Sequence, residues 1–127
     1  DPWKHMATCV MLNRRSIKQV SRVIDKFFEQ YPTPYAYAEH IHRFSGRPFI
    51  HSMLKPLGLS EQRTETLLAL AMSLLTRHGR SMLDVLKSVP GLGKYAIDSY
   101  RLVELGDMTT EPTDKKLLRW KSERLHA

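Results

Sequence analysis

The sequence has little cysteine and no long apolar run. Cys9 is the only cysteine among 127 residues, so an intramolecular disulfide and a cysteine-ligated cluster are both excluded. A chain without disulfides fits a reducing, intracellular compartment. Apolar runs stay well below the length of about 18 residues that a membrane-spanning helix needs, and nothing resembles a signal peptide. We therefore expect a domain that does not enter a membrane, with Cys9 buried as a packing residue.

Strand and hairpin signals are also absent. Val, Ile and Tyr form no alternating runs, and neither Asn-Gly nor Asp-Gly occurs. Apolar residues instead recur at helical spacing, as they do from Ile17 to Phe28 behind the N-cap candidate Ser16. With 42% hydrophobic residues and no internal repeat or linker, residues 1–127 are expected to form one compact all-α domain.

Proline and glycine mark where the other helices begin and end. The sequence predicts further helices over residues 2–13, 34–44, 60–77, 82–88 and 95–105, and a last helix that begins at Thr113 or Asp114. Ser60 is expected to be the N-cap of the long helix over residues 60–77. Gly46-Arg47-Pro48 is interpreted as a break, with no helix assigned between it and Ser60.

Positive charge exceeds negative charge. The chain has 20 Lys and Arg against 13 Asp and Glu, which gives a formal charge of +7. Such an excess favours a polyanionic partner, either nucleic acid or an acidic membrane surface. Many basic domains bind neither, so the charge needs a motif beside it to indicate a function.

The turn Pro90-Gly91-Leu92-Gly93-Lys94 provides that motif. Its two glycines permit positive φ and leave backbone N–H groups bare at the start of the next helix, where an anion is favoured. Leu92 is expected to pin the turn between its flanking helices, and Lys94 adds a cation. A lone Gly-x-Gly usually does no more than reverse the chain. With a helix on each side and a lysine beside it, the pattern is typical of a helix-hairpin-helix DNA-binding unit, here at about residues 82–105.

Asp114 is the second candidate. It follows Pro112-Thr113 at the start of the last helix, and on spacing alone it is an N-cap carboxylate. The amides of a helix N-terminus also favour the ionised form. An ionised carboxylate is what is needed to stabilise a developing oxocarbenium ion or to activate water. The two roles are therefore compatible.

These segments resemble the helix-hairpin-helix DNA glycosylase superfamily. Gly91–Arg101 and Glu111–Leu117 carry the resemblance, and Asp1–Lys4, Leu12–Arg14 and Leu54–Leu59 narrow it to the mismatch-specific thymine/uracil glycosylase type that vertebrates fuse to a methyl-CpG-binding domain. The motifs are spread over nearly the whole chain in the order of the family. The resemblance implies that Asp114 is the catalytic carboxylate.

The resemblance also implies a monofunctional enzyme. Bifunctional members have a Schiff-base lysine two residues after the second hairpin glycine, and here that position is Tyr95. Lys94 comes one residue too early and is assigned to the DNA backbone. Tyr95 and Lys116 are placed near the pocket with Asp114, while a packing role for Tyr95 stays open. Members with an iron–sulfur cluster have four C-terminal cysteines, so no cluster is expected here.

Two further residues match the family's contacts inside the duplex. Arg14 matches the arginine that enters the space left by the flipped nucleotide, and Leu59 matches the apolar wedge. A base inside a duplex cannot be attacked, so its extrusion must be stabilised by a plug. A solvated loop cation for Arg14, and a hydrophobic staple before the Ser60 helix for Leu59, are the structural alternatives.

No metal site made of side chains is expected. The spacing of the histidines does not suit ligands of one ion; they are His5, His40, His42, His51, His78 and His126. The superfamily implies instead a monovalent cation on backbone carbonyls, here those of Lys87, Val89 and Leu92. No other cofactor is expected.

The implied reaction is hydrolysis of thymine or uracil from a mispair with guanine in double-stranded DNA, by a monomer in a nucleus or in a bacterial or viral nucleoid. Two alternatives stay open. One is a glycosylase of another specificity, such as adenine opposite oxidised guanine. The other is a helix-hairpin-helix DNA-binding module without catalysis, in which Asp114 is only a cap.

Overall fold

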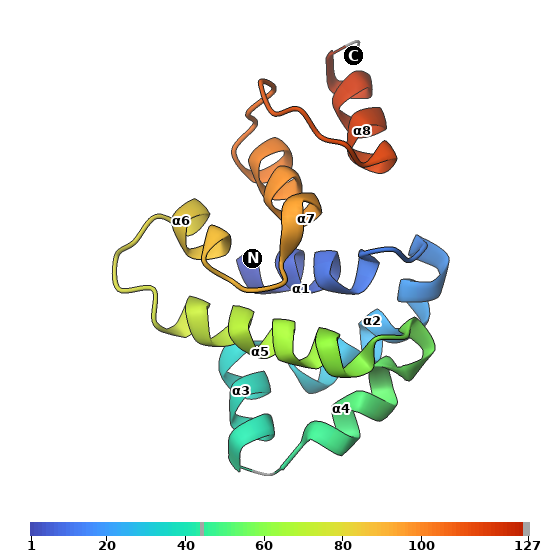
Figure 1. Ribbon diagram of the computed structural model, residues 1–127, viewed down its shortest axis with the longest axis vertical. Helices are drawn as coiled ribbons and strands as arrows, with labels where there is room; N and C mark the ends of the chain where they lie inside the picture. The colour runs from blue at the N-terminus through green and yellow to red at the C-terminus, as the bar shows by residue number, and fades with distance from the viewer. Residues whose placement is uncertain (44, 126–127) are drawn as a thin grey trace.

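All regular structure in the part of the chain that the computed structural model describes, residues 1–43 and 45–125, is helical (Figure 1). The helices are α1 (Pro2–Leu12), α2 (Ile17–Gln30), α3 (Pro34–Arg43), α4 (Arg47–Leu54), α5 (Ser60–Leu75), α6 (Met82–Lys87), α7 (Gly93–Ser99) and α8 (Lys115–Leu125). A 3-10 turn, η1 (Lys55–Leu57), follows α4, and a π-helical segment, η2 (Tyr100–Glu104), continues α7. The all-α prediction is confirmed. Phe44, the expected end of the third helix, and His126 lie outside the described residues.

The chain between Gly46 and Ser60 differs from expectation. The prediction of a break without a helix was wrong, because Gly46 is the N-cap of α4 and Pro48 lies in the first turn of that helix. A proline costs no hydrogen bond there, since the first amides of a helix have no partner within it. Pro56 lies in the same way at the start of η1. The two prolines therefore start helical turns.

The prediction that Ser60 is an N-cap was also wrong. Leu59 is the N-cap of α5, with φ of 50°, and Ser60 is the first helical residue. The chain enters α5 through a left-handed turn, in which Gly58 also has positive φ, and no side-chain hydrogen bond caps the helix. Ser16, in contrast, forms the complete capping box with Gln19 that begins α2.

The centre of the fold is α5, which packs against α1, α3 and α4 (Figure 1). Four buried aromatic residues fill the space around it: Trp3, Phe27, Tyr31 and Tyr37. The ring centroids of Tyr31 and Tyr37 lie 5.0 Å apart, and those of Trp3 and Tyr37 lie 5.6 Å apart. Trp3 Nε1 donates to the Tyr31 carbonyl at 2.9 Å and Tyr37 Oη donates to the Thr64 carbonyl at 2.9 Å. The polar atoms of these large side chains are thus satisfied inside the core.

Helix α8 lies apart from this core, beyond α7 (Figure 1). Leu117 is its one buried residue among those described. Polar contacts hold the helix instead: Lys121 Nζ donates to the Thr110 carbonyl at 2.8 Å, and Lys116 Nζ donates to the Arg15 carbonyl at 3.1 Å. Within residues 1–43 and 45–125, no helix has the length and apolar character to span a membrane.

Cys9 provides a test of the packing between α1 and α7. Its side chain is buried, as predicted, and burial raises the pKa of the thiol to about 11 against the opposite effect of a hydrogen bond with Ser99. Because the thiolate is the reactive form, the folded protein should react with iodoacetamide at pH 8 at least about 100-fold more slowly than an exposed cysteine. Mass spectrometry of timed samples measures the rate, with the urea-unfolded chain as control. Equal rates in folded and unfolded protein would contradict this packing.

Candidate functional site

The Gly91–Lys94 hairpin has the geometry that its glycines predict. Gly91 and Gly93 have φ of 82° and 81°. Leu92 is buried in the main core, which confirms its predicted packing role. Helix α7 begins at Gly93, two residues earlier than expected, so the amides of Lys94 and Tyr95 belong to its first turn. The hairpin therefore presents helix N-terminal amides that favour an anion.

The two glycines have different surroundings. A Cβ added to Gly91 would lie 2.7 Å from Thr66 Oγ1, so the hairpin backbone rests directly on α5 at this point. A Cβ added to Gly93 would meet nothing within 4 Å. Gly91 is thus required by both its φ and its close contact, whereas Gly93 is required by φ alone and leaves the neighbouring backbone uncovered.

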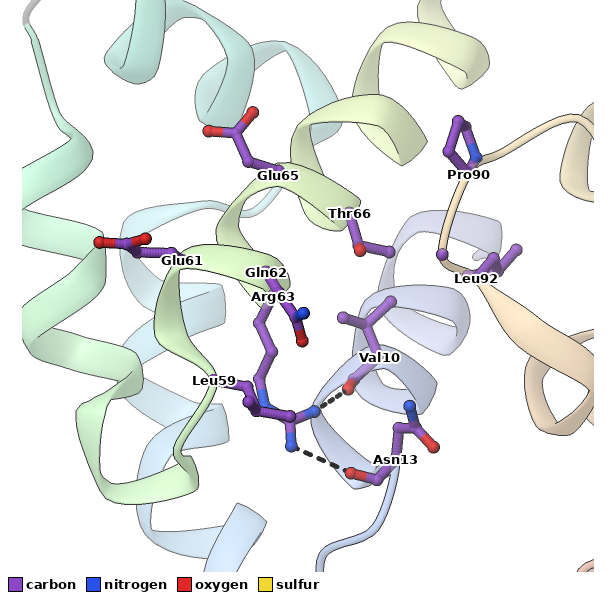
Figure 2. Close-up of a pocket in the computed structure, with 11 residues that line it drawn as sticks. Val10, Asn13, Leu59, Glu61, Gln62, Arg63, Glu65, Thr66, Pro90 and Leu92 are labelled. Carbon is purple, nitrogen blue, oxygen red and sulfur yellow. Dashed lines mark hydrogen bonds between the residues drawn. The ribbon is translucent and has the colours of Figure 1, made fainter.

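A pocket of about 620 Å³ lies where the hairpin meets α1 and α5 (Figure 2). Its lining includes three of the predicted DNA-binding residues, Leu59, Gly91 and Leu92. Pro90 of the hairpin also lines it, and the rest of the lining comes from the end of α1 and the first turns of α5; these residues are Val10, Asn13, Glu61, Gln62, Arg63, Glu65 and Thr66. The fold therefore joins segments that lie far apart in the sequence. The predicted catalytic residues do not line this pocket.

Arg14 and Leu59 both have a left-handed backbone conformation. Their φ values are 61° and 50°, a conformation that non-glycine residues adopt rarely and that often marks a functional position. Both side chains are exposed; for Leu59 the exposed fraction is 53%. That exposure disfavours the alternative in which Leu59 is a hydrophobic staple, because a staple residue buries its side chain against the helix.

Asp114 is the N-cap of α8. Its Oδ1 accepts hydrogen bonds from the amides of Lys116 at 2.8 Å and Leu117 at 3.3 Å, and the side chain is half-buried. Tyr95 packs against the core, and burial, followed by the charges of Cys9 and Asp114, raises the pKa of its phenol to about 12. Tyr95 therefore lies within electrostatic range of Asp114 and is a neutral phenol at physiological pH.

The two lysines near Asp114 hold backbone carbonyls. Lys116 Nζ donates a hydrogen bond to the carbonyl of Arg15, the residue that follows Arg14 in the sequence. Lys94 Nζ donates to the carboxylate of Asp98 and, at 2.9 Å, to the carbonyl of Glu111. Lys94 thus connects α7 to the segment that precedes Asp114. The sequence predicted only a contact of Lys94 with the DNA backbone and not this internal one. Sequence reasoning missed Asp98, although its i,i+4 spacing from Lys94 was a signal.

A second polar network joins the start of α1 to the end of α7. His5 Nε2 lies 2.7 Å from Ser99 Oγ, and His5 Nδ1 lies 2.9 Å from Glu104 Oε1. A serine, a histidine and a carboxylate in successive contact resemble the catalytic triad of a hydrolase. Ser99 is buried, however, and does not line the pocket of Figure 2. Burial lowers the pKa of His5 against the opposing charge of Glu104. Among the described residues, no three His, Cys, Asp or Glu side chains form a group that could hold a metal ion.

Comparison with known proteins identifies relatives over nearly the whole chain, although no family model matches it. A thymine-DNA glycosylase of Aeropyrum pernix is 29% identical over 94% of this chain and 52% of its own length. A thymine/uracil-DNA glycosylase of Pyrobaculum aerophilum is 29% identical over 94% of this chain and 50% of its own length. A methyl-CpG-binding domain protein 4-like protein of Arabidopsis thaliana is 29% identical over 92% of this chain and 24% of its own length.

These similarities confirm the resemblance drawn from the motifs. The chain is related to proteins named as thymine and uracil glycosylases and to one named for a methyl-CpG-binding domain, the combination that the motifs indicated. It spans about half the length of the two archaeal relatives and about a quarter of the plant protein.

The contrast between the hairpin glycines can be measured. We expect Gly93→Ala to lower the free energy of unfolding by about 1 kcal/mol, because alanine is strained at positive φ. Gly91→Ala should cost at least about 1 kcal/mol more, because its methyl group also meets Thr66. Urea unfolding of both variants beside the wild type measures the difference. An equal loss for the two variants would contradict the close contact between the hairpin and α5.

Proposed function

We propose that this chain is the helix-hairpin-helix domain of a monofunctional DNA N-glycosylase that removes thymine or uracil from a mispair with guanine. The observation that carries the proposal is the setting of Asp114, a carboxylate fixed on the first amides of α8 and within electrostatic range of Tyr95. The relatives named as thymine and uracil glycosylases support the same reaction and substrate.

In this proposal the protein first binds the phosphate backbone of the DNA and then inserts side chains into the duplex. The amides of the Gly91–Lys94 hairpin bind a phosphate, with the excess positive charge of the chain adding attraction. The exposed side chains of Arg14 and Leu59 then enter the base stack and hold the target base outside it. Extrusion costs a few kcal/mol, so these two contacts set how much of the substrate is ready for reaction.

Asp114 performs the chemistry. As the glycosidic bond breaks, positive charge grows on the sugar, and a carboxylate already held in place stabilises it without reorganisation. The amides of Lys116 and Leu117 hold this carboxylate in one orientation. Tyr95 stays a neutral phenol and has no amine to form a Schiff base, so water takes the place of the base: its hydroxyl bonds to the sugar carbon and its proton balances the charge of the departing base. The products are the free base and an intact strand with an abasic site.

No cofactor is required in this proposal. A monovalent cation on the carbonyls of Lys87, Val89 and Leu92 would lie between the last residue of α6 and the N-cap of α7, where the Val89 carbonyl also accepts a hydrogen bond from the Leu92 amide at 3.3 Å. When bound, such a cation would add positive charge beside the phosphate. We also propose a monomer that works on double-stranded DNA inside the cell, in a nucleus or a nucleoid.

One observation favours a second candidate function. The carboxylate of Asp114 forms a full N-cap, a role that needs no substrate. A helix-hairpin-helix module that binds DNA without cleaving it would use Asp114 in this way. The experiment must therefore change the charge of Asp114 and keep its cap.

Asp114→Asn meets this need, because asparagine caps helices as well as aspartate does. We expect the variant to fold with nearly unchanged stability and to lose excision of thymine and uracil opposite guanine by about 100-fold or more. The measurement uses labelled duplexes with G·T, G·U or adenine opposite oxidised guanine, followed by alkali to cleave abasic sites. Glu123→Gln, an exposed change on the same helix, is the matched control and should keep full activity.

The outcomes separate the candidates. Strand breaks that need alkali and vanish in Asp114→Asn support the proposal, and the duplex that reacts identifies the base. Tight binding without breaks on any duplex favours the binding module. Breaks without alkali contradict the monofunctional assignment based on Tyr95.

The binding mode makes a separate prediction. If hairpin amides and basic side chains meet phosphates, the logarithm of duplex affinity should fall linearly with the logarithm of salt concentration, by about 0.9 per phosphate contact. We expect at least about a tenfold loss between roughly 50 and 200 mM salt. Fluorescence anisotropy of a labelled duplex measures it, and an affinity indifferent to salt would rule out this mode.

A further inference from the structure

The most unusual polar residue outside the proposed catalytic groups is Arg63 on α5. Its side chain is 4% exposed, and among the described residues it forms no ion pair with a carboxylate. Burial, with a smaller effect of the nearby Arg15, lowers the pKa of its guanidinium. A buried cation without a carboxylate is costly, and an apolar side chain of similar volume would fill the same space at lower cost. The position therefore needs another explanation.

The guanidinium binds four backbone carbonyls that lie in or next to two loops, the one after α1 and the one before α5. Nη1 donates to Val10 at 2.6 Å and Nη2 donates to Asn13 at 3.0 Å, both at the end of α1 (Figure 2). On the other side, Nε donates to Gly58 at 3.0 Å and Nη2 donates to Leu57 at 3.5 Å. The planar guanidinium offers five donors in fixed directions, so it can bond all four carbonyls of both loops at once, whereas a lysine ammonium has only three donors.

These two loops carry the proposed intercalating residues. Asn13 immediately precedes Arg14, and Gly58 immediately precedes Leu59; Arg14 and Leu59 both have positive φ. The loops also lie against each other, because a Cβ added to Gly58 would be 3.2 Å from Arg15 Nη2. A left-handed non-glycine residue persists only where its surroundings enforce it. Arg63 supplies fixed hydrogen bonds next to both.

We propose that Arg63 is a positioning residue that holds the Arg14 loop and the Leu59 loop at a fixed separation, so that plug and wedge enter the duplex as one unit. The inference rests on the proposed function, in which Arg14 and Leu59 stabilise the flipped state. Arg63 itself touches no substrate. Its effect is on extrusion of the base and is separate from the cleavage step at Asp114.

The test uses Arg63→Lys, which keeps the charge and loses the fork, in two backgrounds. On a G·U duplex, under single-turnover conditions, we expect the rate to fall by about tenfold to a hundredfold. In the Arg14→Ala/Leu59→Ala background the same change should have little further effect, because the plug and the wedge that Arg63 positions are both already gone. A loss of the same size in that background would overturn the proposal, since it would show that Arg63 acts independently of Arg14 and Leu59.

A second readout separates positioning from stability. A 2-aminopurine beside the target base becomes brighter when that base leaves the stack, so its amplitude on binding reports extrusion without chemistry. Arg63→Lys should reduce this amplitude. The matched control is a substitution of Leu70, also buried on α5 two turns further along, chosen as Leu70→Val or Leu70→Ala to equal the loss of melting temperature. An equal loss of amplitude in this control would assign Arg63 a purely structural role.

The same data distinguish this inference from the proposed function. Wild-type protein that excises no base but still brightens 2-aminopurine would refute the glycosylase proposal. The effect of Arg63→Lys on that signal would still decide the positioning role. Wild-type protein that neither excises nor brightens would overturn both, because there would be no insertion for Arg63 to organise.

Discussion

The arrangement of the candidate site depends on how the N-terminal half of α5 packs against the C-terminal half of α1. Leu59 precedes α5, Arg63 reaches from it to the carbonyls at the end of α1, and Thr66 supports Gly91 of the hairpin. Every segment that the proposed function brings to the DNA backbone or the base stack therefore touches one short stretch of helix. A shift of α5 along α1 would displace the wedge, the plug and the phosphate site together.

The catalytic side is held by a different kind of contact. Helix α8 buries little apolar surface, so its position depends on hydrogen bonds between lysines and carbonyls. Lys94 holds the Glu111 carbonyl ahead of Asp114, and Lys116 holds the Arg15 carbonyl. The second contact links the helix that is capped by Asp114, the proposed catalytic carboxylate, directly to the loop of Arg14. Single charge-assisted bonds to neutral carbonyls are modest in strength, which leaves this half of the site easier to rearrange than the packed half.

The sequence predicted features that depend on local chemistry. The N-cap role of Ser16, the positive φ of Gly91 and the cap role of Asp114 each follow from a few adjacent residues, and the structure has all three. Helix α4 was missed because a Gly-x-Pro segment suits a break and a first helical turn equally, and only packing decides between them. Arg63 could not be predicted, because an arginine on a helix normally reaches solvent and its carbonyl partners come from distant segments.

What distinguishes an enzyme from a DNA clamp in this fold is therefore not the hairpin. A hairpin with paired glycines binds a phosphate in either case, and the buried fork of Arg63 would serve a clamp that only distorts DNA as well as one that cleaves it. The discriminating feature is a single carboxylate that the amides of α8 orient and that lies within electrostatic range of the neutral phenol of Tyr95. Since Oδ1 accepts both cap hydrogen bonds, the cap fixes the orientation of the group that the reaction needs. In the proposed function one carboxylate therefore has both roles: the helix that needs Asp114 as its cap also fixes the orientation of the proposed catalyst.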